Sequence, residues 1–315
     1  MGQMLIQYYK RNSIVIGVYI LLAALIIIFG LLTRLTSSHL IDMFRQAAPL
    51  GIVAMGQTLC LLMGGIDLSV GAVVSLTNIM LCTFMAGRAE NIFIAMLVVL
   101  VVSSIIGLVN GIAVVIVKIP PFLATLATSI IITGGSFVYT RGSPVGSMAP
   151  ELRFISEGWV GAIPISGIIW LSIMIVLAFF LYRTTTGLRF YSTGGNPQAS
   201  WLSGINTKRL TILAYLLSTL MAAAGGLMIT AYIGVSSPNV GEPYTLNSIA
   251  AACIGGTAFT GGRGGLGGTF AGVMVIFVIQ AFMTMLGIPE AGKQVSLGLI
   301  IIVMVALNQR LSAKQ

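Results

Sequence analysis

The sequence predicts an all-α, polytopic membrane protein with about ten transmembrane helices. Of its 315 residues, 57% are hydrophobic and only 7% are charged, whereas a soluble domain carries about 25% charged residues. Long charge-free stretches recur along the chain, most of them near the length of about 20 residues that crosses a bilayer as a helix. Because these stretches are continuously apolar rather than alternating, they favour helices over a β-barrel.

Charged residues separate the apolar stretches, and we expect each stretch to form one span. A further charge-free window, 190–207, is rich in Gly, Ser, Thr and Asn, so we expect a loop there. The three cysteines fall inside predicted spans without metal-ligand spacing and are expected to be packing residues. The predicted spans are 12–33, 46–66, 68–87, 91–117, 119–140, 158–182, 210–241, 243–262, 264–289 and 294–309.

The distribution of charge predicts the orientation. With the N-terminus inside and ten spans, the inside segments hold ten Lys or Arg residues and one acid, Asp67, whereas the outside segments hold six of each sign. The positive-inside rule favours this arrangement, so both termini are expected in the cytoplasm. The net charge of +9 therefore reflects topology and does not indicate a nucleic-acid partner.

We expect no soluble domain, so that residues 1–315 form a single transmembrane domain. Two polar stretches interrupt the predicted spans. Residues 140–163 are expected to form an extracytoplasmic loop, and residues 183–210 a cytoplasmic loop.

The cytoplasmic loop contains the signals of a short helix at 197–203. Asn196 is a favoured N-cap, Pro197 suits the first helical position, and Gly204 suits the left-handed residue that ends a helix. Trp201 and Leu202 give this helix an apolar edge. It is either a coupling helix that docks into a cytoplasmic partner or an interfacial helix at the lipid headgroups, and the residues alone leave both interpretations open.

Asp67 lies in a glycine-rich segment between two predicted spans. An acid within the membrane is costly, which makes it a functional candidate. The structural alternative, which we favour, is that Asp67 or Ser69 caps the following helix, whose dipole suits an acid. None of the other acids, and not His39, lies in the middle of a span, which argues against a proton relay.

Polar residues within the spans are candidates for contact with a neutral, hydroxyl-rich substrate, although each could equally bond a neighbouring helix. Nothing supports catalysis: the sequence has no nucleophile–base pair, metal spacing or nucleotide loop. We expect a non-catalytic chain without cofactor or metal, powered by another chain if transport is powered. The candidate translocation-pathway residues are Gln57, Asp67, Ser69, Asn78, Asn110, Phe122, Thr125 and Asn247.

Two segments resemble a known family. The run Gly-Ile-Asp-Leu-Ser-Val-Gly at 65–71 is similar to a signature of the permease subunits of bacterial ribose-type sugar ABC importers, and residues 194–206 resemble their cytoplasmic coupling segment. The likeness covers nearly the whole chain, in order. The chain departs from the family at Trp201, where small or charged residues are usual, which leaves the identity of the docked ATPase open. Further matches are at 121–126, 139–145, 249–251 and 255–257.

The resemblance implies a homodimeric permease in the bacterial inner membrane, surrounded by lipid, with the fold of the vitamin B12 importer class. It implies cytoplasmic ATPase domains, often two fused in one chain, and a periplasmic binding protein that delivers a ribose-like monosaccharide. Alternative substrates are autoinducer-2 or a nucleoside, and an alternative of another class is an autonomous secondary sugar facilitator. The residues that would contact the ATPase are Asn196, Pro197, Gln198, Ala199, Ser200, Trp201, Leu202, Ser203 and Gly204.

Overall fold

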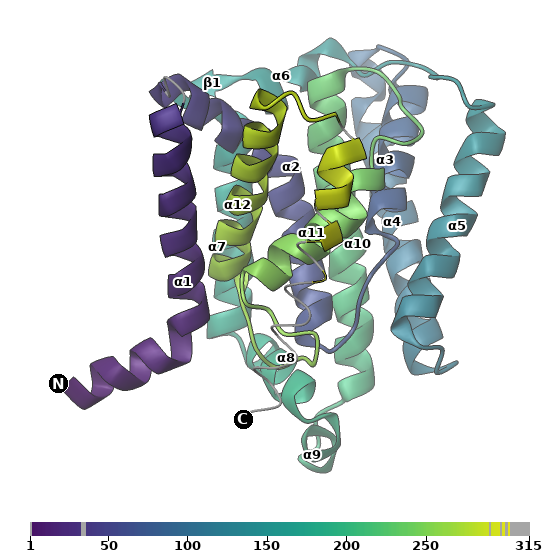
Figure 1. The fold of residues 1–315 in the computed structure, drawn as a ribbon. Helices are drawn as coiled ribbons and strands as arrows, with labels where there is room; N and C mark the ends of the chain where they lie inside the picture. Colours follow the sequence, from purple (N-terminus) through teal and green to yellow (C-terminus); the bar gives the residue numbers. More distant parts are fainter. Residues whose placement is uncertain (1, 33–35, 290, 297, 300–301, 303–315) are drawn as a thin grey trace.

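The protein forms a bundle of helices, with α1 and α5 at opposite edges (Figure 1). The computed structural model describes side chains from residue 14 onward, except that of Ser37, and the backbone of residues 2–32, 36–289, 291–296, 298–299 and 302. The elements are α1 (Gly2–Leu32), α2 (Ser37–Leu62), α3 (Val70–Met85), η1 (Ala89–Asn91), α4 (Ile92–Val115), α5 (Pro121–Thr140), η2 (Pro150–Arg153), α6 (Phe154–Glu157), β1 (Trp159–Val160), β2 (Ile163–Pro164), α7 (Ile165–Arg183), α8 (Thr185–Gly195), α9 (Pro197–Leu202), α10 (Thr207–Ile233), α11 (Glu242–Ile254) and α12 (Leu266–Met285).

The predicted fold class, an all-α polytopic membrane protein, is confirmed. Within the described residues, six helical segments are long and apolar enough to cross a bilayer, in α1, η1–α4, α5, α7, α10 and α12. The predicted number of ten is approximate, because α3 and α11 have 16 and 13 residues. At 1.5 Å per residue they reach about 24 and 20 Å, less than a hydrocarbon core of about 30 Å. The tenth predicted span, 294–309, lies largely outside the described residues.

Several predicted boundaries were wrong, and three of them have an identifiable physical reason. The second span was placed at 46–66, but α2 begins at Ser37, because Arg45 and Asp42 form an ion pair at 3.4 Å that lets both charges lie within the helix. The window 190–207 was expected to be a loop, but its first residues complete α8. There the side chain of Phe190, which is fully buried, anchors the helix despite its small polar neighbours.

The third correction concerns the span predicted at 243–262. Its helix, α11, ends at Ile254, and residues 255–265 form an irregular segment that we call the α11–α12 turn. Gly256 and Gly261 have φ values of 86° and 85° there, a left-handed conformation that glycine adopts without steric cost. A second irregular segment, residues 63–69, joins α2 to α3 and is called the α2–α3 turn.

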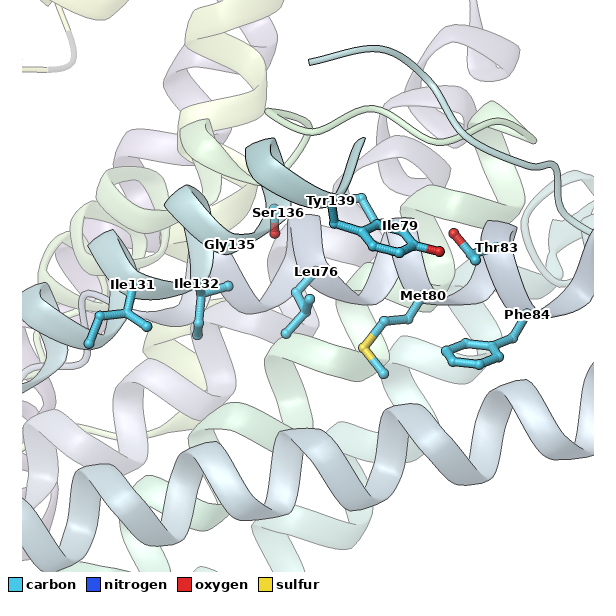
Figure 2. A pocket seen from close by; sticks show the side chains of 10 residues that line it. All are labelled: Leu76, Ile79, Met80, Thr83, Phe84, Ile131, Ile132, Gly135, Ser136 and Tyr139. Atoms are coloured by element: carbon cyan, nitrogen blue, oxygen red, sulfur yellow. The ribbon is translucent and has the colours of Figure 1, made fainter. Parts of the chain in front are cut away.

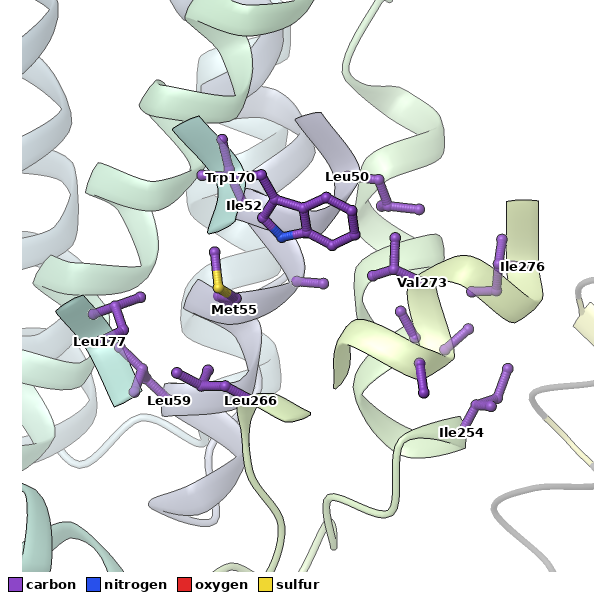
Figure 3. Close-up of a cluster of buried hydrophobic side chains, with 14 of the residues drawn as sticks. Leu50, Ile52, Met55, Leu59, Trp170, Leu177, Ile254, Leu266, Val273 and Ile276 are labelled. Carbon is purple, nitrogen blue, oxygen red and sulfur yellow. The ribbon is translucent and has the colours of Figure 1, made fainter. Parts of the chain in front are cut away.

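The hydrophobic core joins α2, α7 and α12, and includes Ile254 at the end of α11 (Figure 3). Trp170 of α7 is 1% exposed and stacks on Phe270 of α12, with ring centroids 4.8 Å apart. Gly51 of α2 makes room for this indole, since a β-carbon there would lie 2.0 Å from Trp170 Cε2. The core therefore fixes α2 as an inner helix.

The polar stretches between the spans lie at opposite ends of the bundle. Residues 140–163 contribute η2, α6 and the short antiparallel ribbon of β1 and β2. Residues 183–210 contain α8 and α9 at the other end (Figure 1). These ends are called the α6 end and the α9 end, and α1 begins at the α9 end.

Candidate functional site

The first candidate site is α9, which projects from the bundle (Figure 1). Asn196 Oδ1 accepts a hydrogen bond of 2.9 Å from Ala199 N, Pro197 is the first residue of the helix, and Gly204 has a φ of 80°. These are the three signals that the sequence contained. The side chains of Trp201 and Leu202 are 66% and 73% exposed, so the helix presents an apolar surface at its tip.

Gly194, just before α9, packs directly on the backbone at the end of α2 and in the α11–α12 turn. A β-carbon on Gly194 would lie 1.7 Å from the Leu62 carbonyl oxygen, and one on Gly261 would lie 2.6 Å from the Gly194 carbonyl oxygen. Gly262 N donates a hydrogen bond of 2.9 Å to the same Leu62 oxygen. We call this contact the glycine junction, formed by Gly64, Gly194, Gly195, Gly261 and Gly262.

A tyrosine adds a second link between α8 and the α11–α12 turn. The hydroxyl of Tyr191 donates a hydrogen bond of 3.2 Å to Gly264 O, and its ring stacks on Tyr182 with centroids 6.2 Å apart. The arm formed by α8 and α9 is therefore attached to the end of α2 and, by two links, to the α11–α12 turn.

Asp67 lies in the α2–α3 turn and is completely buried. Its Oδ1 accepts hydrogen bonds from Ser69 N at 2.9 Å and Ser69 Oγ at 2.5 Å, and its Oδ2 accepts one from Ser218 Oγ at 2.8 Å. Ser69 precedes α3 as its N-cap residue without bonding the helix through its side chain. Asp67 thus shapes the turn and joins it to α10, instead of capping α3 itself.

The hydrogen bonds extend from Ser69 to two further helices. Asn110 Nδ2 of α4 donates to Ser69 Oγ at 2.9 Å, and Thr128 Oγ1 of α5 donates to Asn110 Oδ1 at 2.7 Å. Thr125 Oγ1 of α5 accepts from Leu68 N at 3.0 Å. This buried polar network therefore ties the α2–α3 turn to α4, α5 and α10.

The predicted pathway residues divide into two groups. Gln57 belongs to the network, because its amide, oriented to satisfy both groups, donates to Asp67 O at 3.0 Å and accepts from Asp67 N at 3.3 Å. Asn78 lies apart and bonds Thr230 and the backbone of residues 235 and 237. Phe122 is half-exposed at the start of α5, and Asn247 is buried in α11. The polar residues that the sequence indicated thus mostly bond one another.

Comparison with known proteins identifies the family. Residues 39–305 match the family model described as "Branched-chain amino acid transport system / permease component". The chain belongs to this permease family. The ribose import permease protein RbsC of Bacillus subtilis is 32% identical over 302 residues, which cover 95% of the permease described here and 94% of that relative.

Two further relatives have other sugars in their names. The fructose import permease protein FrcC of Rhizobium meliloti is 32% identical over 273 residues, covering 84% of this permease and 76% of the relative. The galactose/methyl galactoside import permease protein MglC of Haemophilus influenzae is 31% identical over 325 residues, covering 97% and 96%. No solved structure matches the permease with significance.

Two cavities in the described part of the permease are lined by none of the eight predicted pathway residues. One, of about 320 Å³, is an apolar groove between α3 and α5 (Figure 2). The other, of about 180 Å³, lies among α2, α10, α11 and α12 and contains Arg45, Tyr232 and Tyr244. Sequence reasoning missed these three residues because it placed Arg45 in a loop and did not consider tyrosines as pathway residues.

We predict that Ser218→Ala destabilises the permease by about 1.5–3 kcal/mol, because a hydrogen bond to a charged group has that value. The matched control is Ser104→Ala in α4, whose exposed hydroxyl bonds only the Leu100 carbonyl of its own helix. The measurement is the midpoint of thermal unfolding of the purified permease in detergent. Equal midpoints for the two variants would contradict the role of Asp67 as the centre of the network.

Proposed function

We propose that the chain is the membrane-spanning subunit of an ATP-driven importer of a neutral monosaccharide, with ATP hydrolysis supplied by a separate cytoplasmic ATPase. The observation that carries the proposal is the exposed apolar tip of α9, Trp201 and Leu202. Trp is enriched among the side chains that anchor protein–protein interfaces, and the exposed Leu202 extends the apolar surface of Trp201. The names of the relatives, which include ribose, fructose and galactose import permeases, support a monosaccharide as substrate.

In this proposal α9 is the coupling helix and residues 196–204 contact the ATPase. The positive-inside rule supports a cytoplasmic α9 end, since Arg183, Arg189, Lys208 and Arg209 flank α8 and α9. The N-terminus would then be cytoplasmic too, because α1 begins at this end (Figure 1). A periplasmic binding protein would deliver the sugar at the α6 end, and the protein would reside in a bacterial inner membrane.

The glycine junction gives α9 a mechanical connection to the membrane domain. Gly194 touches the end of α2 and the α11–α12 turn without intervening side chains, so a displacement of α9 is not absorbed by rotamer changes. The α2–α3 turn carries Asp67, whose bonds reach α4, α5 and α10 through the polar network. We infer that ATP-driven movement of α9 reaches these helices by this route.

The alternative is a facilitator that works alone. It requires no docking surface, and the exposed Trp201 and Leu202 would then serve only to anchor α9 at the lipid headgroups. The two functions are distinguished by the need for ATP, a binding protein and a partner ATPase.

We further propose that two copies pair through α5. The groove of Figure 2 lies between α3 and the second half of α5. Gly134 lies in the same half of α5, and a β-carbon on it would meet no atom within 4 Å. Ser136 and Thr83 have buried hydroxyls without a hydrogen-bond partner in the described part of the chain. Small residues and free hydroxyls are what associate helices in lipid, where the hydrophobic effect gives no driving force.

For ATP coupling, we predict that the permease imports sugar in proteoliposomes only with its ATPase, binding protein and ATP. The double variant Trp201→Ala and Leu202→Ala should lose the ATPase on co-purification, since truncating an interface anchor costs about 2 kcal/mol or more. Trp159→Ala is the matched control, because Trp159 is also exposed but lies in β1 at the opposite end. Uptake by the chain alone, or full ATPase recovery with the double variant, would exclude the proposal.

For the glycine junction, we predict that Gly194→Ala retains the bound ATPase but lowers ATP-driven uptake about tenfold or more, the scale of a typical coupling energy. The new methyl group would overlap the Leu62 carbonyl oxygen and separate the arm from the turn. Gly195→Ala is the neighbouring control, since a β-carbon there meets nothing within 4 Å. Normal uptake by Gly194→Ala would show that the contact transmits no movement.

For the dimer, we predict that Gly134→Cys forms a disulfide-linked pair in native membranes after mild oxidation. Cys60, Cys82 and Cys253 are all buried, so the parent protein should stay monomeric on a non-reducing gel. Gly17→Cys is the control, because Gly17 is equally open but lies on α1 at the other edge of the bundle (Figure 1). Cross-linking of Gly17→Cys in place of Gly134→Cys would place the dimer contact on α1 and contradict pairing through α5.

A further inference from the structure

The cavity at the α6 end is a partly open pocket formed by a single chain, and Tyr232 in its wall is 41% exposed. It lies among α2, α10, α11 and α12, and Ser156 of α6 also lines it. Its volume of about 180 Å³ corresponds to roughly six water molecules at about 30 Å³ each. This is the size of one small ring compound, and it is too small for a disaccharide.

Aromatic side chains form much of the cavity wall. Tyr232 ends α10, Tyr244 lies in the first turn of α11, and Phe277 belongs to α12. In the described part of the chain, neither tyrosine hydroxyl has a hydrogen-bond partner. The wall thus combines flat apolar faces with free hydroxyls, which is the combination that binds the C–H face and the hydroxyls of a sugar ring.

Arg45 supplies a charged donor at the same place. Its guanidinium lies 5.5 Å from the centre of the Tyr232 ring, a cation–π distance that orients both side chains. Its Nε is buried and makes no hydrogen bond, although it lies 3.4 Å from Asp42 Oδ1 as an ion pair. Because Nε is buried against Asp42, a ligand in the cavity would take its hydrogen bonds from the terminal nitrogens of the guanidinium.

The positive charge in the cavity wall is neutralised by a neighbouring carboxylate. Arg45 is the only charged residue among those that line it, and the Asp42 carboxylate beside it neutralises the pair. An anionic ligand would therefore compete with Asp42 for the guanidinium, whereas a neutral ligand leaves the ion pair intact. A sugar hydroxyl can accept from Arg45 without disturbing it.

We propose that this cavity is a binding site for one neutral monosaccharide ring at the outer end of the permease, with Tyr232 and Tyr244 against the ring and Arg45 donating to a ring hydroxyl. The proposal rests on the proposed function as a monosaccharide permease, and it adds the place where the permease itself holds the sugar. It separates this site from the buried polar network, whose hydrogen bonds are already used within the protein.

The test is equilibrium binding of tritiated D-ribose and D-galactose to the full-length chain in lipid nanodiscs, without ATPase or binding protein. We expect saturable binding of at least one sugar, displaced by the unlabelled sugar but not by the anion ribose 5-phosphate. Tyr244→Phe, which removes only a hydroxyl, should weaken binding about tenfold, and Tyr232→Phe provides a second variant. Tyr139→Phe in the α3–α5 groove is the matched control and should bind as the parent does.

Three results would overturn the proposal. The first is the absence of saturable binding at sugar concentrations up to about 100 mM, some hundredfold above a millimolar dissociation constant. The second is native affinity in both cavity variants or a loss of affinity in Tyr139→Phe, and the third is equal displacement by ribose 5-phosphate.

Uptake by the complete transporter distinguishes this proposal from the proposed function. If uptake requires ATP while Tyr244→Phe keeps the native KM, the importer function stands and the cavity site is wrong. If the chain alone moves sugar without ATP, the importer function is wrong, whatever the cavity binds.

Discussion

The structure depends on two stretches of irregular backbone whose polar groups are satisfied largely by the surrounding helices. No water is present in the hydrocarbon core to bond free N–H and C=O groups, so such backbone is tolerated only where protein satisfies it. In the α2–α3 turn, Gly65 N bonds Cys60 O, and Leu68 N bonds Thr125 Oγ1. In the α11–α12 turn, Gly262 N bonds Leu62 O. Each turn therefore depends on elements that are distant in sequence, and α5 is tied into the bundle because it supplies one of these acceptors.

Glycine and aspartate meet this constraint in different ways. Glycine lets backbones approach until their polar groups pair directly, as Gly194 does against Leu62. Asp67 supplies an acceptor with two oxygens, which takes bonds from its own turn and from Ser218 of α10. Asp67 is therefore buried because the irregular backbone needs its acceptors. A role in proton exchange during transport is not needed to explain the burial of this acid.

Local signals in the sequence predicted what local forces determine. The composition was sufficient to predict the fold class. Asn196, Pro197 and Gly204 were sufficient to predict α9, because capping acts within a few residues. The failures have two physical causes, one local and one that joins distant segments. The ion pair of Asp42 and Arg45 lengthens α2 beyond its charge-free window. Of the cavity residues, Arg45 and Tyr244 are almost 200 positions apart, so only the packing of α2 against α11 places them together.

The polar network and the cavity lie at different positions along the same two helices, α2 and α10. Ser218 of α10 bonds Asp67, and Tyr232 of the same helix lines the cavity at the α6 end, 14 residues or about 21 Å further along. Likewise, α2 carries Gln57 at the network and Arg45 at the cavity. A helix transmits displacement along its axis with little loss, because its backbone bonds are internal. A movement of the glycine junction would therefore reach the cavity through α2 and α10 and change the distance between Arg45 and Tyr232. The two helices carry this displacement themselves, so no chain of contacting side chains between the two ends is required.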